Sequence, residues 1–317
     1  MRILFVTPYP PSCYRVRSYG FLTQLERKHE VTVMALCRSE RELADAEALR
    51  NRGHEVVIVH EPRLQAILRS GLALASLRSM HVAYAQSEGF TQMLHWLCRQ
   101  RHFDVVHVEH LRGIAAIEPL VPGLPLVWDA VDCISLLYKQ AIVAGPTLAM
   151  RVVALLEHER LQDYEARLLN KLQHVVVTSE RDQQALIDLR RIHSGEMMND
   201  NNSSGSSISV LPNGVDLEYF RPVEDALADS QRKRFNLVFS GKMNYHPNIA
   251  TVLYLYQQIM PIIWQHRPET TLTIVGGEPP KVIQRLTRDP RVEVTGYVDD
   301  IRAVSYTHLT LPTILRV

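Results

Sequence analysis

Residues 235–248 read FNLVFSGKMNYHPN, and this stretch decides the fold. An apolar run over Phe235–Ser240 predicts a strand, Gly241 and Lys242 follow at its end, and a helical pattern begins near Pro247. A strand that passes through a short glycine turn into a helix is the repeating unit of a parallel α/β sheet. The stretch therefore predicts the first βα unit of an α/β domain.

The chain after this unit repeats the same alternation. Strands are predicted at Thr271–Val275 and Val292–Thr295, and helices at Asn248–Gln265 and Pro280–Arg288. Glycines follow both strands, in IVGGEPP and TGYVDD. We expect these elements to form one parallel sheet with the strand at 235–240.

The chain before this unit predicts a larger α/β domain. Several strand candidates are near-continuous runs of Val, Ile and Leu, as expected where helices cover both faces of a sheet. In the longest helical stretch, Ala149–Leu172, apolar side chains recur at helical spacing at Leu161, Tyr164 and Leu168. The fold class predicted is thus α/β with two doubly wound parallel sheets. The predicted strands are Ile3–Val6, Val31–Ala35, Glu55–His60, Val105–Val108, Leu124–Trp128, Val175–Thr178 and Ile208–Leu211, and the other predicted helices are Arg17–Lys28, Glu40–Arg52 and Thr91–Arg101.

Two polar stretches interrupt the predicted alternation of strands and helices, and the second of them separates the two domains. Residues 194–207, SGEMMNDNNSSGSS, are too poor in apolar side chains to order themselves and predict a surface insertion. Residues 223–234 are charged and without pattern, which indicates a linker. We therefore predict an N-terminal domain over 1–214, a linker over 215–234 and a partial C-terminal domain over 235–303. Two cores are expected at 317 residues, because single cores seldom grow beyond ~250 residues.

The last residues depart from the pattern. Another amphipathic helix is due after residue 302, but the chain reads VSYTHLTLPTILRV. Residues 304–313 look like the in-frame translation of a transposon-type sequencing adaptor, which predicts a non-native tail at 304–317 and a truncated C-terminal domain. A genuine short strand is the alternative. A longer native reading frame after residue 303 would support the first interpretation.

Charge and cysteine content disfavour several classes of protein. The 35 Lys and Arg and 34 Asp and Glu give a formal net charge of +1, so no global field favours nucleic acid. The four cysteines are scattered without a CxxC pair, which indicates reduced thiols. No stretch approaches the ~18 apolar residues of a membrane span. We expect a cytoplasmic protein, at most peripheral at the inner face of the plasma membrane.

Two arginines follow the first strand. The loop Thr7–Arg17, TPYPPSCYRVR, comes after the carboxyl end of that strand, where ligands bind in open α/β sheets. Arg15 and Arg17 stand at the start of the next helix and could meet an anionic group there. Solvated surface arginines are an equally good interpretation. The loop has no glycine fingerprint, so a dinucleotide site is not supported.

Two carboxylates end another predicted strand, in VWDAVD. Asp129 and Asp132 suit hydroxyl binding, or general-base catalysis if burial raises a carboxyl pKa. Helix capping by Asp132 is the structural alternative. Both are therefore carried as candidate catalytic residues.

The turn Pro-Asn-Gly in LPNGVDLEYF precedes the predicted linker. Either Asn213 or Gly214 can take a positive φ there, which would expose backbone amides to a ligand between the domains. Beyond the linker, Gly241 lets a ligand approach the backbone and Lys242 offers a cation beside a helix start. This combination of groups predicts a diphosphate site.

The later glycine loops predict the rest of that site. Gly276 and Gly277 in IVGGEPP, and Val298 in TGYVDD, follow strands of the same sheet and could bind a nucleotide base and ribose. Ordinary βα turns that bind no ligand would show the same glycine pattern. No metal is expected, because His107 and His110 in HVEH do not give a convergent ligand set.

One basic amphipathic segment has two interpretations. Residues 63–80, RLQAILRSGLALASLRSM, could lie on an anionic membrane surface. The same pattern fits an ordinary packed helix, which is the favoured reading.

The ordered set PNGVDLEYF, FSGKMNYHPN, IVGGEPP and VTGYVDDIR resembles family-4 retaining glycosyltransferases of the GT-B fold. The likeness spans residues 1 to about 303. It is greatest to the sugar transferases associated with exosortase/PEP-CTERM exopolysaccharide systems, which open with a similar PP…R-x-R-S-Y pattern. The residues of this chain that match that pattern are Pro10, Pro11, Arg15, Arg17, Ser18 and Tyr19.

The resemblance implies two Rossmann-like domains facing a cleft. It also implies metal-free transfer of a sugar, with retention, from a nucleotide-diphosphate donor to a glycan or lipid-linked acceptor. Gly241 and Lys242 match the family's phosphate-binding pair, and Asp129 or Asp132 falls near its acceptor-side residue. The family's second cation is replaced by Asn248, and its E-x7-E motif is absent, so the truncated chain is expected to be inactive.

Two other classes of function remain open from the sequence. One is another GT-B enzyme, such as a nucleotide-sugar 2-epimerase. The other is a non-catalytic module that binds a nucleotide and turns nothing over.

Overall fold

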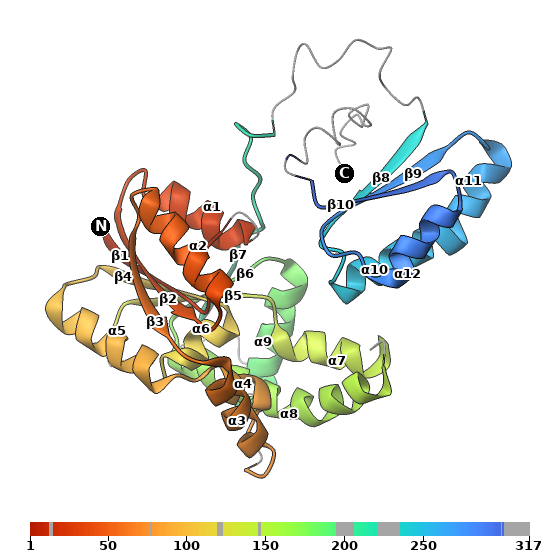
Figure 1. The fold of residues 1–317 in the computed structure, drawn as a ribbon. Coiled ribbons are helices and arrows are strands. Elements are labelled where there is room, and N and C mark those ends of the chain that lie inside the picture. Colours follow the sequence, from red (N-terminus) through yellow and green to blue (C-terminus); the bar gives the residue numbers. More distant parts are fainter. Residues whose placement is uncertain are drawn as a thin grey trace. The chain divides into compact units, whose positions relative to one another are not determined.

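The computed structural model describes residues 1–12, 15–76, 78–118, 123–144, 147–194, 206–220, 235–298 and 300. The chain divides into two compact units, Met1–Val215 (unit 1) and Asp216–Val317 (unit 2), and each contains a parallel sheet with helices (Figure 1). Most of the predicted insertion, most of the predicted linker and the whole predicted tail lie outside the described residues. No helix of the described residues is both long and apolar enough to cross a membrane.

Unit 1 contains a seven-stranded sheet in the order β3-β2-β1-β4-β5-β6-β7, with every neighbouring pair parallel. All seven strands predicted for this part of the chain are present. The strand order reverses between β1 and β4, which makes that position the topological switch point of the sheet. The strands are β1 (Arg2–Thr7), β2 (Glu30–Cys37), β3 (Glu55–His60), β4 (Val105–Glu109), β5 (Leu126–Val131), β6 (His174–Val177) and β7 (Ser207–Val210).

Helices connect these strands. Several begin where a hydroxyl side chain caps the first turn: Ser39, Ser87 and Thr147 each accept a hydrogen bond from a backbone N–H three residues on. Helices α4, α6 and α7 were not predicted; α4 and α6 span less than the window in which helical periodicity becomes visible. The helices are α1 (Val16–Leu25), α2 (Glu40–Asn51), α3 (Arg63–Ala73), α4 (Met80–Ala85), α5 (Glu88–Gln100), α6 (His110–Ala116), α7 (Ile134–Ala144), α8 (Leu148–Lys171) and α9 (Glu180–Ser194).

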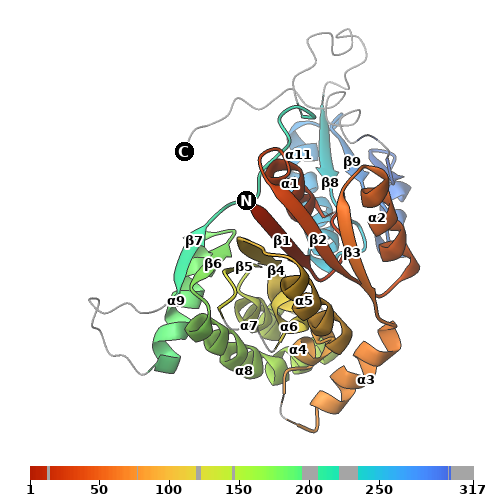
Figure 2. The same ribbon diagram turned by 90° about the vertical axis from the view of Figure 1, so that its left-hand side faces the viewer.

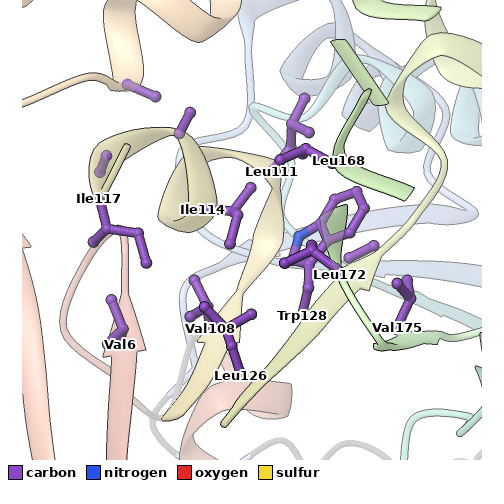
Figure 3. Packing of buried hydrophobic residues seen from close by; sticks show 14 of the residues in the cluster. Val6, Val108, Leu111, Ile114, Ile117, Leu126, Trp128, Leu168, Leu172 and Val175 are labelled. Atoms are coloured by element: carbon purple, nitrogen blue, oxygen red, sulfur yellow. The ribbon is translucent and has the colours of Figure 1, made fainter. Parts of the chain in front are cut away.

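Two apolar clusters hold this sheet between its helices. One joins the sheet to α6 and α8 and is centred on Trp128 of β5, which is completely buried beside Leu168, Leu172 and Ile114 (Figure 3). The other joins the opposite face to α1 and α2 through residues such as Phe5. Truncating a buried aromatic side chain of this kind costs ~3–5 kcal/mol, so the clusters keep the carboxyl edge of the sheet in place.

Unit 2 contains a three-stranded parallel sheet in the order β10-β9-β8. The helix predicted over 248–265 is interrupted by a π turn, because Pro261 lacks the N–H that a continuous helix needs. A small cluster around Met243, Leu272 and Ile274 packs the helices on this sheet. The elements are β8 (Asn236–Ser240), α10 (His246–Tyr254), η2 (Leu255–Ile259), α11 (Met260–His266), β9 (Thr271–Val275), α12 (Lys281–Gln284), η3 (Arg285–Arg288) and β10 (Val292–Gly296).

Candidate functional site

The three strands of unit 2 end at one edge of their sheet. β8 ends at Ser240, β9 at Val275 and β10 at Gly296. Because the strands are parallel, the loops that follow them meet at this edge, where ligands bind in open α/β sheets. These loops carry four of the predicted binding residues, which together form the glycine edge: Gly241, Lys242, Gly276 and Gly277.

Glycine is required where two of these loops touch. The N–H of Gly241 donates to the carbonyl oxygen of Val275 at 3.0 Å, and the N–H of Gly276 donates to that of Gly296 at 2.9 Å. Gly276 has φ +155°, and a Cβ added to it would lie 1.8 Å from the carbonyl oxygen of Gly241. Any side chain at position 276 would therefore force the two loops apart.

Lys242 stands between the glycine edge and α10. Its side chain is exposed and makes no hydrogen bond or ion pair within the described part of the chain. The side-chain amide of Asn248 donates to the carbonyl oxygen of Lys242 at 3.0 Å and so braces the loop. Asn248 thus has a structural role at the position where the sequence resemblance led us to expect a second cation.

The first turn of α10 offers the backbone N–H groups of His246 and Asn248, whereas Pro247 between them has none. Its N-cap residue, Tyr245, makes no side-chain capping bond, and the first turn holds no acidic residue. Unpaired N–H groups at a helix start attract anions, and the helix dipole adds to that attraction. Together with the ammonium of Lys242, these groups can neutralise a diphosphate without a metal ion.

Unit 1 contains a second group of predicted residues, beside its switch point. Arg17 at the start of α1 holds Asp129 at the end of β5 through two hydrogen bonds of 2.9 Å. The same guanidinium donates to the carbonyl oxygen of Leu211 and to the side-chain oxygen of Asn213, both at 3.0 Å. The structure therefore brings together three residues that lie far apart in the sequence.

Asp129 is completely buried in this network. Burial alone would raise the pKa of its carboxyl group, but the imidazole of His107, whose Nε2 lies 3.6 Å away, and the hydrogen bonds from Arg17 outweigh burial and hold the pKa below its usual value. A carboxylate that is ionised and fully engaged is a weak base. This geometry suits the positioning of Arg17 and Asn213 better than proton abstraction by Asp129.

Asp132 has a different environment. It is partly buried, and burial and the charge of Asp182 raise the pKa of its carboxyl group. It follows Val131, whose φ of +68° is rare for a β-branched residue and costs ~1–3 kcal/mol. Strain of this kind is concentrated at functional positions.

Two residues that the sequence did not mark as site residues flank the switch point. Glu109 ends β4 in the HVEH stretch and accepts a hydrogen bond from Ser18 at 2.7 Å, and its second oxygen is buried without a partner among the described residues. Burial raises the pKa of this carboxyl group. His110 is strained at φ +65°, and burial lowers its pKa to about 4. The signal available in the sequence was their place at a strand end.

The remaining predicted residues lie apart from these contacts. Arg15 donates to the carbonyl oxygen of Pro10 at 2.6 Å and pairs with Glu42 and Asp45 of α2 at 3.4 and 3.5 Å. Its charge therefore holds the loop after β1 against α2. Gly214 has no neighbour within 4 Å of the place a Cβ would take, and it does not have a positive φ. Val298 is partly buried just beyond β10.

Comparison with known proteins agrees with this architecture. Residues 234–309 match the family model for glycosyl transferases group 1. No curated protein sequence matches the chain. Two solved structures share its fold: an E. coli trehalose-6-phosphate protein bound with UDP-2-fluoro glucose, and a UDP-forming α,α-trehalose-phosphate synthase from Burkholderia xenovorans.

These structures align along almost the whole chain. The first has a TM-score of 0.55 and 10% identity over 96% of this chain and 76% of its own, and the second has a TM-score of 0.53 and 9% identity over 96% and 75%. At such low identity the likeness concerns the fold. The two parallel-sheet units therefore match the GT-B glycosyltransferase fold.

Proposed function

We propose that the chain is a retaining glycosyltransferase that binds the diphosphate of a nucleotide-sugar donor at the glycine edge. The observation that carries this proposal is the exposed ammonium of Lys242. It stands where the loops after β8 and β9 touch, next to the uncapped start of α10. The match of residues 234–309 to glycosyl transferases group 1 points to the same reaction.

The chemistry of sugar transfer fits these groups. When the bond between the anomeric carbon and the phosphate oxygen breaks, negative charge builds on the departing nucleoside diphosphate. A cation and backbone N–H groups already aimed at that place stabilise the charge without reorganisation. A charge-assisted hydrogen bond from Lys242 is worth ~1.5–3 kcal/mol in this role.

Unit 1 would supply the acceptor side of the reaction. We assign to Asp132 the contact with the acceptor hydroxyl, because its carboxyl pKa is raised and it follows a strained residue. Arg17 and Asp129 act as a positioning pair for Asn213, at the end of the unit. The acceptor we propose is an envelope or exopolysaccharide glycan, or its lipid-linked precursor, on the strength of the sequence resemblance in the loop after β1.

Calorimetry of the 317-residue chain with UDP, GDP and ADP tests the donor site. We expect at least one nucleotide to bind, and Lys242→Ala to weaken that binding about tenfold or more, which corresponds to ~1.4 kcal/mol. Arg288→Ala is the matched control: it also removes one exposed cation from unit 2, but at η3, immediately before β10 begins. Equal affinity in wild type and Lys242→Ala would remove this lysine from the site.

The products formed from a donor separate the three classes of function. A glycosyltransferase releases the nucleoside diphosphate and forms a new glycoside. An epimerase of the same fold would return an isomeric nucleotide sugar. Tight nucleotide binding without any product would favour a non-catalytic module.

A further inference from the structure

Helix α3 exposes its large apolar side chains and buries its small ones. Only Ala66 and Ala73 are buried on this helix. An ordinary surface helix does the reverse and turns its leucines toward the core. The packed-helix interpretation of this segment is therefore wrong for its apolar face. The exposed residues, between 56% and 74% accessible, are Leu64, Ile67, Leu68 and Leu72.

The start of α8 and the end of α7 present a second exposed apolar surface. Val143 at the end of α7 is 77% exposed, and Leu148 at the start of α8 is 78% exposed. Val152 and Leu155 continue this surface along the next two turns. Single exposed apolar residues are normal, but contiguous groups of this size mark interaction sites.

Both apolar surfaces are attached to the same short helix, α4. From α3, Ser70 donates to the carbonyl oxygen of Met80 at 3.1 Å. From α8, the carboxylate of Glu157 accepts hydrogen bonds from the Ser79 hydroxyl at 2.8 Å and from the Met80 and His81 N–H groups at 3.0 Å. Helix α4 packs against both α3 and α8, and Figure 2 shows it between them. The two surfaces are thus held as parts of one rigid support.

The charge of these segments has one sign. Residues 62–87 and 133–156 contain five Lys and Arg and no Asp or Glu, although the whole chain has 34 acidic residues against 35 basic ones. One of the five, Arg69, is paired with Glu61 at 2.8 Å. The side chains of the other four are exposed to solvent, and Arg78 among them donates a hydrogen bond to Gln86 at 3.4 Å; the four are Arg63, Arg78, Lys139 and Arg151.

We propose that α3 and the α7–α8 hairpin form a docking surface for an anionic lipid bilayer. Exposed leucines would enter the interfacial region, and the cations around them would meet the anionic headgroups. A second copy of the chain fits less well, because a symmetric interface would bring these cations face to face. The inference concerns binding to lipid alone, so it does not depend on the proposed transfer reaction.

Vesicle co-sedimentation of the full 317-residue chain tests this surface. We expect binding to vesicles of phosphatidylcholine with one-third phosphatidylglycerol, and weaker binding to pure phosphatidylcholine. Leu68→Glu/Leu72→Glu should lower the partition constant about tenfold or more, and Leu155→Glu should lower it through the second surface. Arg63→Gln and Lys139→Gln should each lower it about fivefold.

Ile192→Glu is the matched control. Ile192 is 74% exposed on α9, outside both surfaces, and its substitution should leave vesicle binding unchanged. Circular dichroism melts confirm that every variant is folded. Equal binding to neutral and anionic vesicles, or unchanged binding of Leu68→Glu/Leu72→Glu, would overturn the proposal. So would sedimentation equilibrium showing a dimer that this double variant dissociates while wild type ignores vesicles.

Discussion

Gly276→Ala gives the sharpest test of how the glycine edge is built. A Cβ at this position would lie 1.8 Å from the carbonyl oxygen of Gly241 and 3.0 Å from its carbonyl carbon. Real Cβ atoms do not come within 3.0 Å of a heavy atom, and the obstructing atoms belong to the backbone. The loops after β8 and β9 must therefore separate by about 1 Å or more before alanine fits.

The cost has two parts. Holding alanine at a φ of +155° costs ~1–3 kcal/mol, because that region is almost restricted to glycine. Separating the loops also weakens the hydrogen bonds from Gly241 to Val275 and from Gly276 to Gly296, at ~1 kcal/mol each. We expect the substitution to destabilise unit 2 by about 3–5 kcal/mol and to abolish nucleotide binding at the glycine edge.

Native-state hydrogen exchange, followed on peptides that cover β8, β9 and β10, measures this effect within unit 2 alone. The protection of these amides should fall about 100-fold or more, whereas that of unit 1 should not change. Gly277→Ala is the control, because the nearest atom to its Cβ would be Tyr297 at 3.8 Å. Gly296→Ala, with φ +72° and open space, should cost only ~1 kcal/mol. If Gly276→Ala exchanged like Gly277→Ala, the close contact would not exist in solution.

Three other substitutions test buried carboxylates of unit 1 and the loop that carries Lys242 in unit 2. Asp129→Ala should destabilise unit 1 by about 3–5 kcal/mol in chemical denaturation, because it leaves the Arg17 guanidinium without its buried partner. Because folding lowers the pKa of Asp129, the stability that this carboxylate contributes to the wild type should be present above about pH 4 and be lost as the pH falls through the folded pKa. The variant should lack this loss. Glu165 is completely buried, and burial raises its pKa from 4.5 to about 7, so the folded state keeps a proton that the unfolded chain releases. The free energy of unfolding should therefore be highest below about pH 4.5 and decline as the pH rises through 7. In urea titrations, Glu165→Gln should make the free energy of unfolding depend less on pH over this range. Asn248→Ala removes no charge but frees the carbonyl oxygen of Lys242, and calorimetry should show nucleoside diphosphate affinity reduced about fivefold; an unchanged affinity would rule out the bracing role.

The parallel sheets could be predicted from the sequence because their signal is local. Runs of Val, Ile and Leu mark strands that are buried on both faces, and each run in this chain became a strand of the expected sheet. The longest helix was also predictable, since Leu161, Tyr164 and Leu168 recur at helical spacing and all three are buried. The position of Gly241 and Lys242 at the end of β8 followed from the same pattern.

The partners of the charged residues were not predictable. Arg15 and Arg17 are two residues apart with the same chemistry, yet Arg15 pairs with α2 and Arg17 with Asp129, which lies 112 residues away. No local pattern separates these outcomes, because the partner of a long side chain depends on which strand end the fold places beside it. Which face of α3 packs against the protein could not be predicted from the sequence for a similar reason. Its alternation of apolar and polar residues is the same whether alanines or leucines face the protein.

The sequence by itself determined the fold class and the sheet edge at which we propose that ligands bind, because hydrophobic periodicity and the glycine turns are properties of neighbouring residues. Tertiary structure alone decided the state of each functional group. It placed the carboxylate of Asp129 in hydrogen bonds with Arg17 and raised the pKa of the Asp132 carboxyl group. It also left the side chain of Lys242 exposed and turned the leucines of α3 toward solvent. Burial and charge pairing depend on groups brought together from distant parts of the chain, and these set the energy of each ionised or apolar side chain.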